Sequence, residues 1–143
     1  MADDHERIDA LLEASHTAAG TFAPELYAQF RRDLLRHIGM EEKVLFRYAQ
    51  AKRGGLALPL VARLHEDHGR IAKLLVPSPT TELVAALKQI LAQHNALEEG
   101  VGALYATCDA LAGDEAADVI ARLNAQPRVP LAPHYDGPPH KRR

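Results

Sequence analysis

The sequence predicts an all-α protein: an up-down-up-down four-helix bundle with a short fifth helix and a Pro-rich C-terminal tail. Composition favours helix, because alanine and leucine dominate, aromatic residues make up only 5% of the chain and tryptophan is absent. Apolar residues recur in steps of three and four along four long segments. The connections between these segments are short, which is typical of antiparallel neighbours in a bundle. The 143 residues suffice for one such domain with its own core.

Glycine and proline mark the ends of the first two helices. The first helix is expected over about residues 4–19, and Gly20 ends it. Pro24 then stands in the first turn of the second helix, where its missing N–H costs nothing. The apolar pattern of that helix continues to about Arg53, and two glycines follow. These two helices form the first predicted hairpin.

The second hairpin is bounded in the same way. The third helix is expected over about residues 58–76 and is closed by a Pro-Ser-Pro sequence. Thr80 or Thr81 caps the fourth helix, which is expected to run without interruption to Gly113. Both hairpins therefore have the same order of elements.

The C-terminal region divides into two further parts. Asp114 is suited to capping a short fifth helix. The remainder, which holds His134 and His140, contains too many prolines for a helix and is expected to be extended. We therefore predict a bundle over residues 1–112, a short C-terminal helix over residues 113–126 and a Pro-rich tail over residues 127–143.

An internal repeat relates the two halves of the bundle. The segment Asp4–Leu12 (DHERIDALL) matches Asp67–Leu75 (DHGRIAKLL), with Asp, His, Arg, Ile and a pair of leucines at the same spacing. His37–Phe46 (HIGMEEKVLF) resembles His94–Tyr105 (HNALEEGVGALY), and both contain His-x-x-x-Glu-Glu-x-Val. Each hairpin therefore supplies a histidine from its first helix and a His-x-x-x-Glu pair from its second.

Six polar residues of this repeat lie on the apolar faces of their helices. In the second helix, His37 and Glu41 continue an apolar face that passes through Phe30 and Leu34. Residues four apart on a helix lie above one another, so each His-x-x-x-Glu pair points both side chains in one direction. Counted from the loops, the depths of the six agree to about one turn, except between the third and fourth helices. The six are His5, His37, Glu41, His68, His94 and Glu98.

Four imidazoles and two carboxylates in an apolar core predict a metal site. Each unpaired buried ion would be strongly destabilising, and bound cations remove this cost. The six side chains offer more ligand atoms than one ion can coordinate. Two ions that share two bidentate glutamates would each also have two histidines. Mixed imidazole and carboxylate ligands with open positions favour two iron ions, with manganese or zinc as the alternatives.

Over roughly residues 4–112 the chain resembles the hemerythrin-like, or HHE cation-binding, proteins. The resemblance rests on a histidine, a His-x-x-x-Glu pair, a second histidine and a second pair, in the order of that family. It implies a non-haem di-iron centre in which Glu41 and Glu98 are bridging carboxylates. It also implies reactivity towards small diatomic or peroxidic ligands.

The chain departs from the oxygen carriers of that family in two places. The carriers have a histidine four residues before the third-helix ligand, where this chain has Leu64. His65 lies three residues before that ligand, and we expect it to diverge by about 60° towards a seam between helices. The carriers also place the last carboxylate one residue later, which would select Glu99, whereas the repeat selects Glu98. These departures argue against reversible oxygen carriage and leave sensing, catalysis and iron handling open.

Residues beside the predicted ligands are expected to have lesser roles. Glu42 and Glu99 lie about 100° around the helix from their glutamate neighbours. This favours solvent-exposed positions, with hydrogen bonding to a ligand histidine as the alternative. Tyr105 and Cys108 lie on the apolar face of the fourth helix and are expected in the core.

Charge and composition argue against several classes of protein. The net charge is −2 and no basic face is present, which argues against a nucleic-acid partner. No apolar run approaches the roughly 18 residues of a membrane span. The first residues lack the pattern of a signal peptide, and a single cysteine cannot form an internal disulfide. We therefore expect a cytoplasmic protein.

The function that the sequence favours is that of a di-iron protein that binds or senses a small ligand such as dioxygen, nitric oxide or peroxide. The first alternative is an enzyme on the same centre, with peroxidase-like, oxygen-reducing or iron–sulfur repair activity. The second alternative is a bundle that holds structural zinc or has a vacant site.

Overall fold

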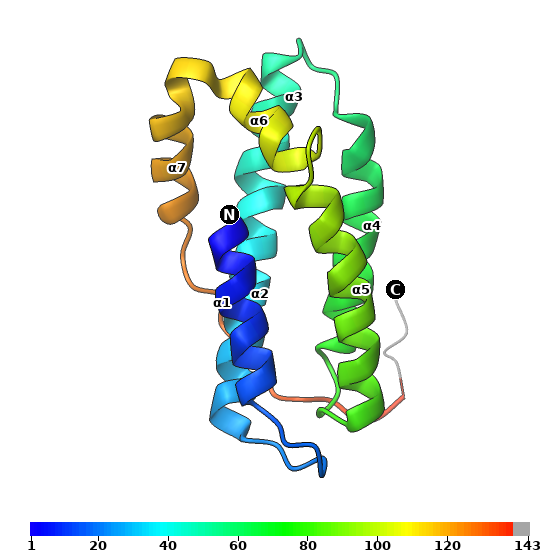
Figure 1. Cartoon of the computed structure of the whole chain (residues 1–143). Coiled ribbons are helices and arrows are strands. Elements are labelled where there is room, and N and C mark those ends of the chain that lie inside the picture. The colour runs from blue at the N-terminus through cyan, green and yellow to red at the C-terminus, as the bar shows by residue number, and fades with distance from the viewer. Residues whose placement is uncertain (139–143) are drawn as a thin grey trace.

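Four long helical segments run alternately up and down in the computed structural model of the protein, which describes residues 1–138 (Figure 1). The predicted four-helix bundle with a short fifth helix and an extended tail is confirmed. His140, predicted in the tail, lies outside the described residues. The elements are α1 (Ala2–Ala14), α2 (Pro24–Met40), η1 (Glu41–Leu45), α3 (Phe46–Lys52), α4 (Pro59–Leu74), α5 (Thr81–Glu99), α6 (Leu104–Ala112), η2 (Gly113–Glu115) and α7 (Ala116–Asn124).

The second segment of the bundle is one continuous helix whose winding changes in the middle. α2 passes directly into η1, a π-helical turn that starts at Glu41, and η1 passes into α3. The sequence predicted a regular α-helix throughout this segment. A π-helical turn takes up an extra residue, and such turns occur frequently at functional sites. The turn begins at one of the six polar residues of the repeat.

The fourth segment is broken, so the prediction of one uninterrupted helix up to Gly113 is wrong. α5 ends at Glu99, and α6 starts at Leu104 in a new direction (Figure 1). Gly102, within the break, has a φ of 72°, a left-handed conformation that glycine adopts without steric cost. Val101 continues the apolar face in the sequence, but the break leaves it fully exposed.

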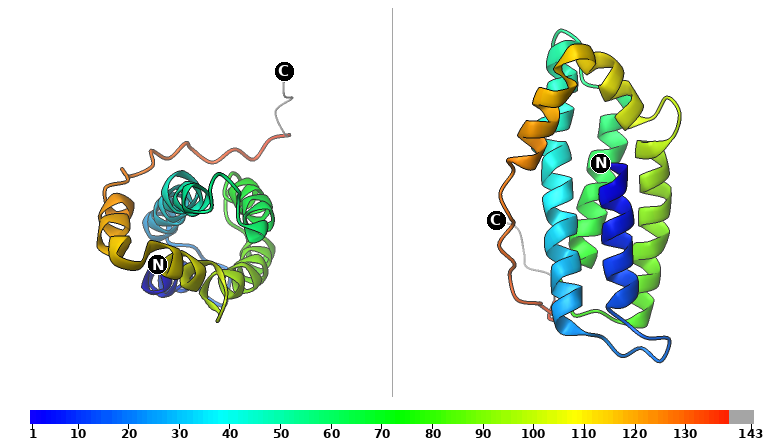
Figure 2. Two further views of the ribbon diagram at one scale, coloured as in Figure 1. Left: turned by 90° about the horizontal axis from the view of Figure 1, so that it is seen from above. Right: turned by 60° about the vertical axis from the view of Figure 1, so that its left-hand side comes forward.

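α6 and α7 complete the upper half of the bundle. α1 has only 13 residues and covers only the lower part of the second segment, as the right-hand view of Figure 2 shows. Above the N-terminus of α1, α6 packs against α3 and α7 packs against η1. Val119 and Leu123 of α7 are buried in one apolar cluster with Leu45 of η1. The chain thus returns over the start of α1, which brings α6 close to the N-terminal residues.

The core consists of two apolar clusters with a polar layer between them. On α2, Leu34 belongs to the lower cluster and Met40 to the upper cluster, and His37 lies between them. On α4, His68 likewise lies between Ile71 of the lower cluster and a leucine of the upper one. The polar layer is therefore enclosed between two apolar clusters.

The chain after α7 runs back along the outside of the bundle as extended backbone (Figure 2). Arg36 donates hydrogen bonds to the carbonyl oxygens of Asn124 and Gln126. Further along, the carboxylate of Asp136 accepts two hydrogen bonds from Ser78. Within the part of the chain that the structure describes, no helix has both the length and the apolar character needed to cross a membrane.

Candidate metal centre

The structure brings the six predicted residues together in the polar layer. Their donor atoms form two overlapping groups, and the atoms of each group lie within 4.8 Å of one another. All six side chains are buried. The first group holds His5, His37, Glu41 and Glu98, and the second holds Glu41, His68, His94 and Glu98.

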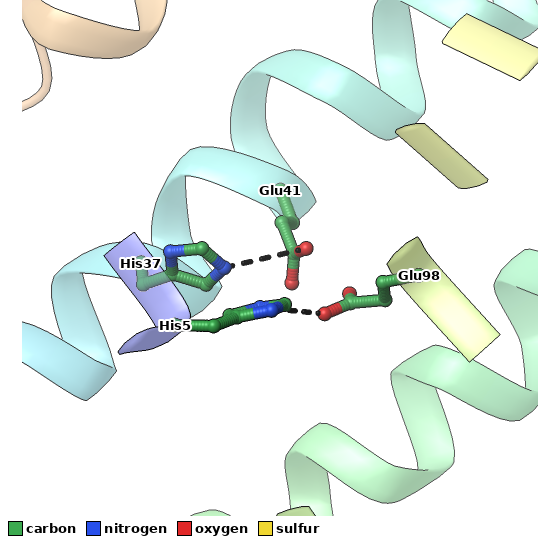
Figure 3. A group of neighbouring side chains, drawn as sticks. All are labelled: His5, His37, Glu41 and Glu98. Carbon is green, nitrogen blue, oxygen red and sulfur yellow. Dashed lines mark ion pairs between the residues drawn. The ribbon is translucent and has the colours of Figure 1, made fainter. Parts of the chain in front are cut away.

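Each of the two glutamates meets one histidine of its own helix and one of the other hairpin. His37 Nε2 lies 3.6 Å from Glu41 Oε2 one turn along the chain, and His5 Nε2 faces Glu98 Oε1 at 3.1 Å (Figure 3). In the second group the corresponding distances are 3.2 Å within α5 and 3.0 Å between the hairpins. The internal repeat therefore produces a two-fold pseudo-symmetry around the two glutamates.

An aspartate holds the outer ring nitrogen of one histidine in each hairpin. Nδ1 of His37 donates a hydrogen bond to Asp4 at 2.8 Å, and Nδ1 of His94 donates one to Asp67 at 3.3 Å. Such hydrogen bonds fix the tautomer and the orientation of a ring, so that Nε2 faces the centre. Sequence reasoning missed both aspartates. The signal was present in the Asp-His pair that opens each copy of the repeat.

A glutamate from the opposite hairpin holds each of the other two histidines. Nδ1 of His5 donates to Glu99 at 2.8 Å, and Nδ1 of His68 donates to Glu42 at 3.0 Å. The sequence favoured solvent-exposed positions for these two glutamates. The structure shows the alternative, hydrogen bonding to a histidine. In each Glu-Glu pair the first residue therefore faces the centre and the second orients a ring.

Without a cation, the buried carboxylates favour the protonated form of the neighbouring histidines. Burial lowers the pKa of His37, but hydrogen bonds to Asp4 and Glu41 outweigh it and raise that pKa from 6.5 to about 9. The pKa values of His68 and His94 are also raised, because their carboxylate neighbours outweigh burial. The hydrogen bond from His37 lowers the pKa of Asp4. Since metals bind neutral imidazole, metal binding must displace protons from these rings.

One carboxylate oxygen of the layer lacks a hydrogen-bond partner. Glu98 is fully buried, and its Oε2 lies 3.2 Å from His94 Nε2 without accepting a hydrogen bond from any residue that the structure describes. A buried carboxylate oxygen in this condition is destabilising. A cation would supply the missing contact, and imidazole with carboxylate is a donor set of transition metals. The residues therefore fit a bound metal.

Comparison with protein families agrees with this geometry. The family model of the hemerythrin HHE cation-binding domain matches residues 1–103. The chain belongs to this family. Its hemerythrin domain contains α1 to α5 and all six residues of the two groups, so the protein is a metal-binding one. A search of curated proteins and a search of solved structures found no match.

The structure places the two positions at which this hemerythrin domain departs from the oxygen carriers. The His65 side chain is 73% exposed and donates through Nδ1 to Glu42 at 2.6 Å, outside both groups. Glu98 is fully buried and belongs to both groups. The Glu99 side chain is 37% exposed and contacts the outer nitrogen of His5. Glu98, and not Glu99, therefore faces the centre of the site.

Tyr105 belongs to the site and was missed by sequence reasoning. It follows Glu98 by seven residues, which is about 10 Å along a straight helix, and was expected in the apolar core. Because the chain turns between α5 and α6, the hydroxyl of Tyr105 instead enters the first group and donates to Glu41 Oε2 at 2.7 Å. Burial and the charges of Glu41 and Glu98 raise the pKa of this phenol. Tyr105 lies beyond the residues that the hemerythrin model matches.

We expect Asp67→Asn to weaken metal binding by about 10- to 100-fold, because the neutral amide holds and polarises the His94 ring less well. Competition with a chromophoric chelator under anaerobic conditions measures this affinity for ferrous iron. Glu66→Gln is the matched control, since Glu66 is the exposed neighbour of Asp67 and pairs with Arg70 on the surface. Equal affinities for both variants would contradict a role of Asp67 in holding His94.

Proposed function

We propose that the two groups hold a pair of iron ions and that the protein binds or senses a small ligand there: dioxygen, nitric oxide or peroxide. The observation that carries the proposal is that Glu41 and Glu98 each belong to both groups. Two ions that share two carboxylates leave each with two imidazoles, which is too few ligands to fill an octahedral shell. Iron held in this way would supply open positions for a small ligand.

The residues of the bundle support this function by orienting the ligands and excluding water. Each of the four histidines is fixed through Nδ1 by a carboxylate, so that little reorganisation accompanies metal binding. Below the layer, the space that borders Leu34, Ile71 and Leu91 has a volume of only ≈ 10 Å³. That volume admits about one water molecule. The lower face of the centre is therefore closed.

A pocket lies above the layer, and Tyr105 stands between it and the first group. This pocket of ≈ 570 Å³ lies between the N-terminus of α1 and the helices α2, α6 and α7. Met40, Leu45 and Cys108 contribute to its wall, and so does Tyr105, whose hydroxyl enters the first group. The apolar part of this wall suits an uncharged diatomic ligand, and Asp4, Arg36 and Asp109 also line the pocket.

The donor set supports the proposed metal, and the cysteine supports the proposed compartment. Imidazole and carboxylate ligands with open positions favour iron over zinc, and manganese is the nearest alternative. The single cysteine, Cys108, is buried and unpaired, which supports a reducing cytoplasmic location.

We expect about two iron ions per chain after anaerobic purification and reconstitution with ferrous iron, since two complete donor groups are present. Elemental analysis measures the stoichiometry, and absorption spectra recorded before and after addition of dioxygen, nitric oxide or peroxide measure ligand binding. A reproducible value of one ion or fewer would defeat the dinuclear centre. Two zinc ions with no iron uptake, or spectra that no ligand changes, would defeat the proposed function.

A further inference from the structure

The hydroxyl of Tyr105 lies among the donor atoms of the first group. Its oxygen is 2.7 Å from Glu41 Oε2 and 3.2 Å from Glu98 Oε1. It is also 3.0 Å from His5 Nε2 and 3.1 Å from His37 Nε2. We propose that Tyr105 is a further metal ligand, whose phenol oxygen coordinates the ion held by the first group. This proposal rests on the metal centre proposed above.

The four distances match those between neighbouring ligands of one ion. Around an octahedral ion with bonds of about 2.1 Å, adjacent donor atoms lie about 3 Å apart. One vertex of an octahedron has four such neighbours. The phenol oxygen, at 2.7 to 3.2 Å from four donor atoms of the first group, has the surroundings of such a vertex.

Hydrogen bonding alone does not account for this position. A neutral phenol donates one hydrogen bond and accepts at most two, so it satisfies at most three of its four neighbours. Two of those neighbours, Glu41 and Glu98, are carboxylates, and only one of them receives the single proton. A cation bound to the phenol oxygen, both carboxylates and both imidazoles satisfies all of them. On coordination the ion replaces the phenol proton, which leaves to the buffer.

Packing alone does not require the hydroxyl either. In the other half of the repeat the corresponding aromatic residue is Phe46, whose ring stacks on His68 at a centroid distance of 5.9 Å. Tyr105 lies beside His5 at a similar centroid distance of 5.6 Å, with the two rings tilted by 39°. The two positions thus differ by the phenol oxygen, which makes the two metal positions chemically unequal.

The backbone directs Tyr105 to this place. The break between α5 and α6 turns the chain at Gly102, and Tyr105 lies in the first turn of α6. Its ring also forms part of the wall of the pocket of ≈ 570 Å³. Coordination by Tyr105 would therefore occupy the position of the first ion that faces the pocket, so that this ion would have fewer open positions than the ion held by His68 and His94.

The test is the appearance of tyrosinate on metal binding. Metal-free protein is titrated with zinc, and the ultraviolet difference spectrum of tyrosinate is recorded together with the number of ions bound. The ferric protein is examined separately for a visible phenolate-to-iron band and for phenolate modes in its resonance Raman spectrum. Tyr48→Phe is the matched control, because Tyr48 is buried in the upper apolar cluster.

We expect the tyrosinate signal and the ferric band in the wild type and in Tyr48→Phe, and the loss of both in Tyr105→Phe while metal is still bound. Metal binding by the wild type without tyrosinate would overturn the Tyr105 assignment and leave the dimetal centre intact. A signal that persists in Tyr105→Phe would also overturn it. If the protein binds neither zinc nor iron, the proposed metal centre is wrong, and the assignment of Tyr105 as a ligand is wrong as well.

Discussion

Removal of the metal with a chelator is expected to lower the melting temperature of the protein by on the order of 10 °C for each ion present at a hundredfold excess over its dissociation constant. Such an excess stabilises the native state by about 2.7 kcal/mol per ion. The effect is large here because the donor atoms come from all four long helical segments. Melting followed by circular dichroism measures it, with re-addition of the metal as the control. Equal melting temperatures with and without chelator would contradict a structural dependence on metal.

The difference in melting temperature between the metal-bound and the metal-free protein should also depend on pH. In the metal-free protein the pKa of His37 is raised from 6.5 to about 9, so its stabilising contribution is fully present below pH 6.5 and is lost as the pH rises through about 9. Metal-bound imidazole carries no such proton and loses no such contribution. The melting temperature of the metal-free protein should therefore fall further below that of the metal-bound protein as the pH rises from 6.5 to 9. A difference that narrows over this range would show that the histidines do not balance the carboxylates.

Glu98→Gln is expected to lower the affinity for both proposed ions by more than about 100-fold, a larger loss than that from a residue that only orients a ligand. The reason is that Glu98 belongs to both donor groups and is fully buried. Glutamine keeps the size of the side chain and removes the negative charge. Elemental analysis after reconstitution measures the loss, and circular dichroism verifies that the variant is folded.

Glu99→Gln is the matched control for this substitution. Glu99 is the neighbouring carboxylate, is 37% exposed and contacts only the outer nitrogen of the His5 ring among the ion pairs of the described residues. We expect this variant to keep two ions with moderately lower affinity. The opposite pattern, with metal lost from Glu99→Gln and retained in Glu98→Gln, would transfer the ligand role to Glu99.

The regular parts of the site were predictable from the sequence because they obey helical spacing. His37 and Glu41 are four residues apart on one apolar face, and the repeat shows the same arrangement on the other hairpin. The structure brings all six predicted residues into one layer. Proline and glycine likewise placed most helix ends, since their effects on the backbone are local.

The parts that sequence reasoning missed depend on departures from a regular helix. The break after Glu99 redirects the chain, and no periodicity shows the direction in which α6 continues. Tyr105 therefore seemed to belong two turns above the site, in the core. The roles of Asp4 and Asp67 also depend on which neighbouring helix each side chain faces, and that is a property of the assembled bundle.

The division of donor atoms between the hairpins has a consequence for the order of folding events. The first group takes three of its residues from the first hairpin and Glu98 from the second, and the second group takes three from the second hairpin and Glu41 from the first. Each hairpin consists of neighbours in the chain and is able to form by local contacts, but neither contains a complete group. Tight capture of metal must follow the docking of the two hairpins, so the rate of metal uptake reports when the halves of the molecule have joined.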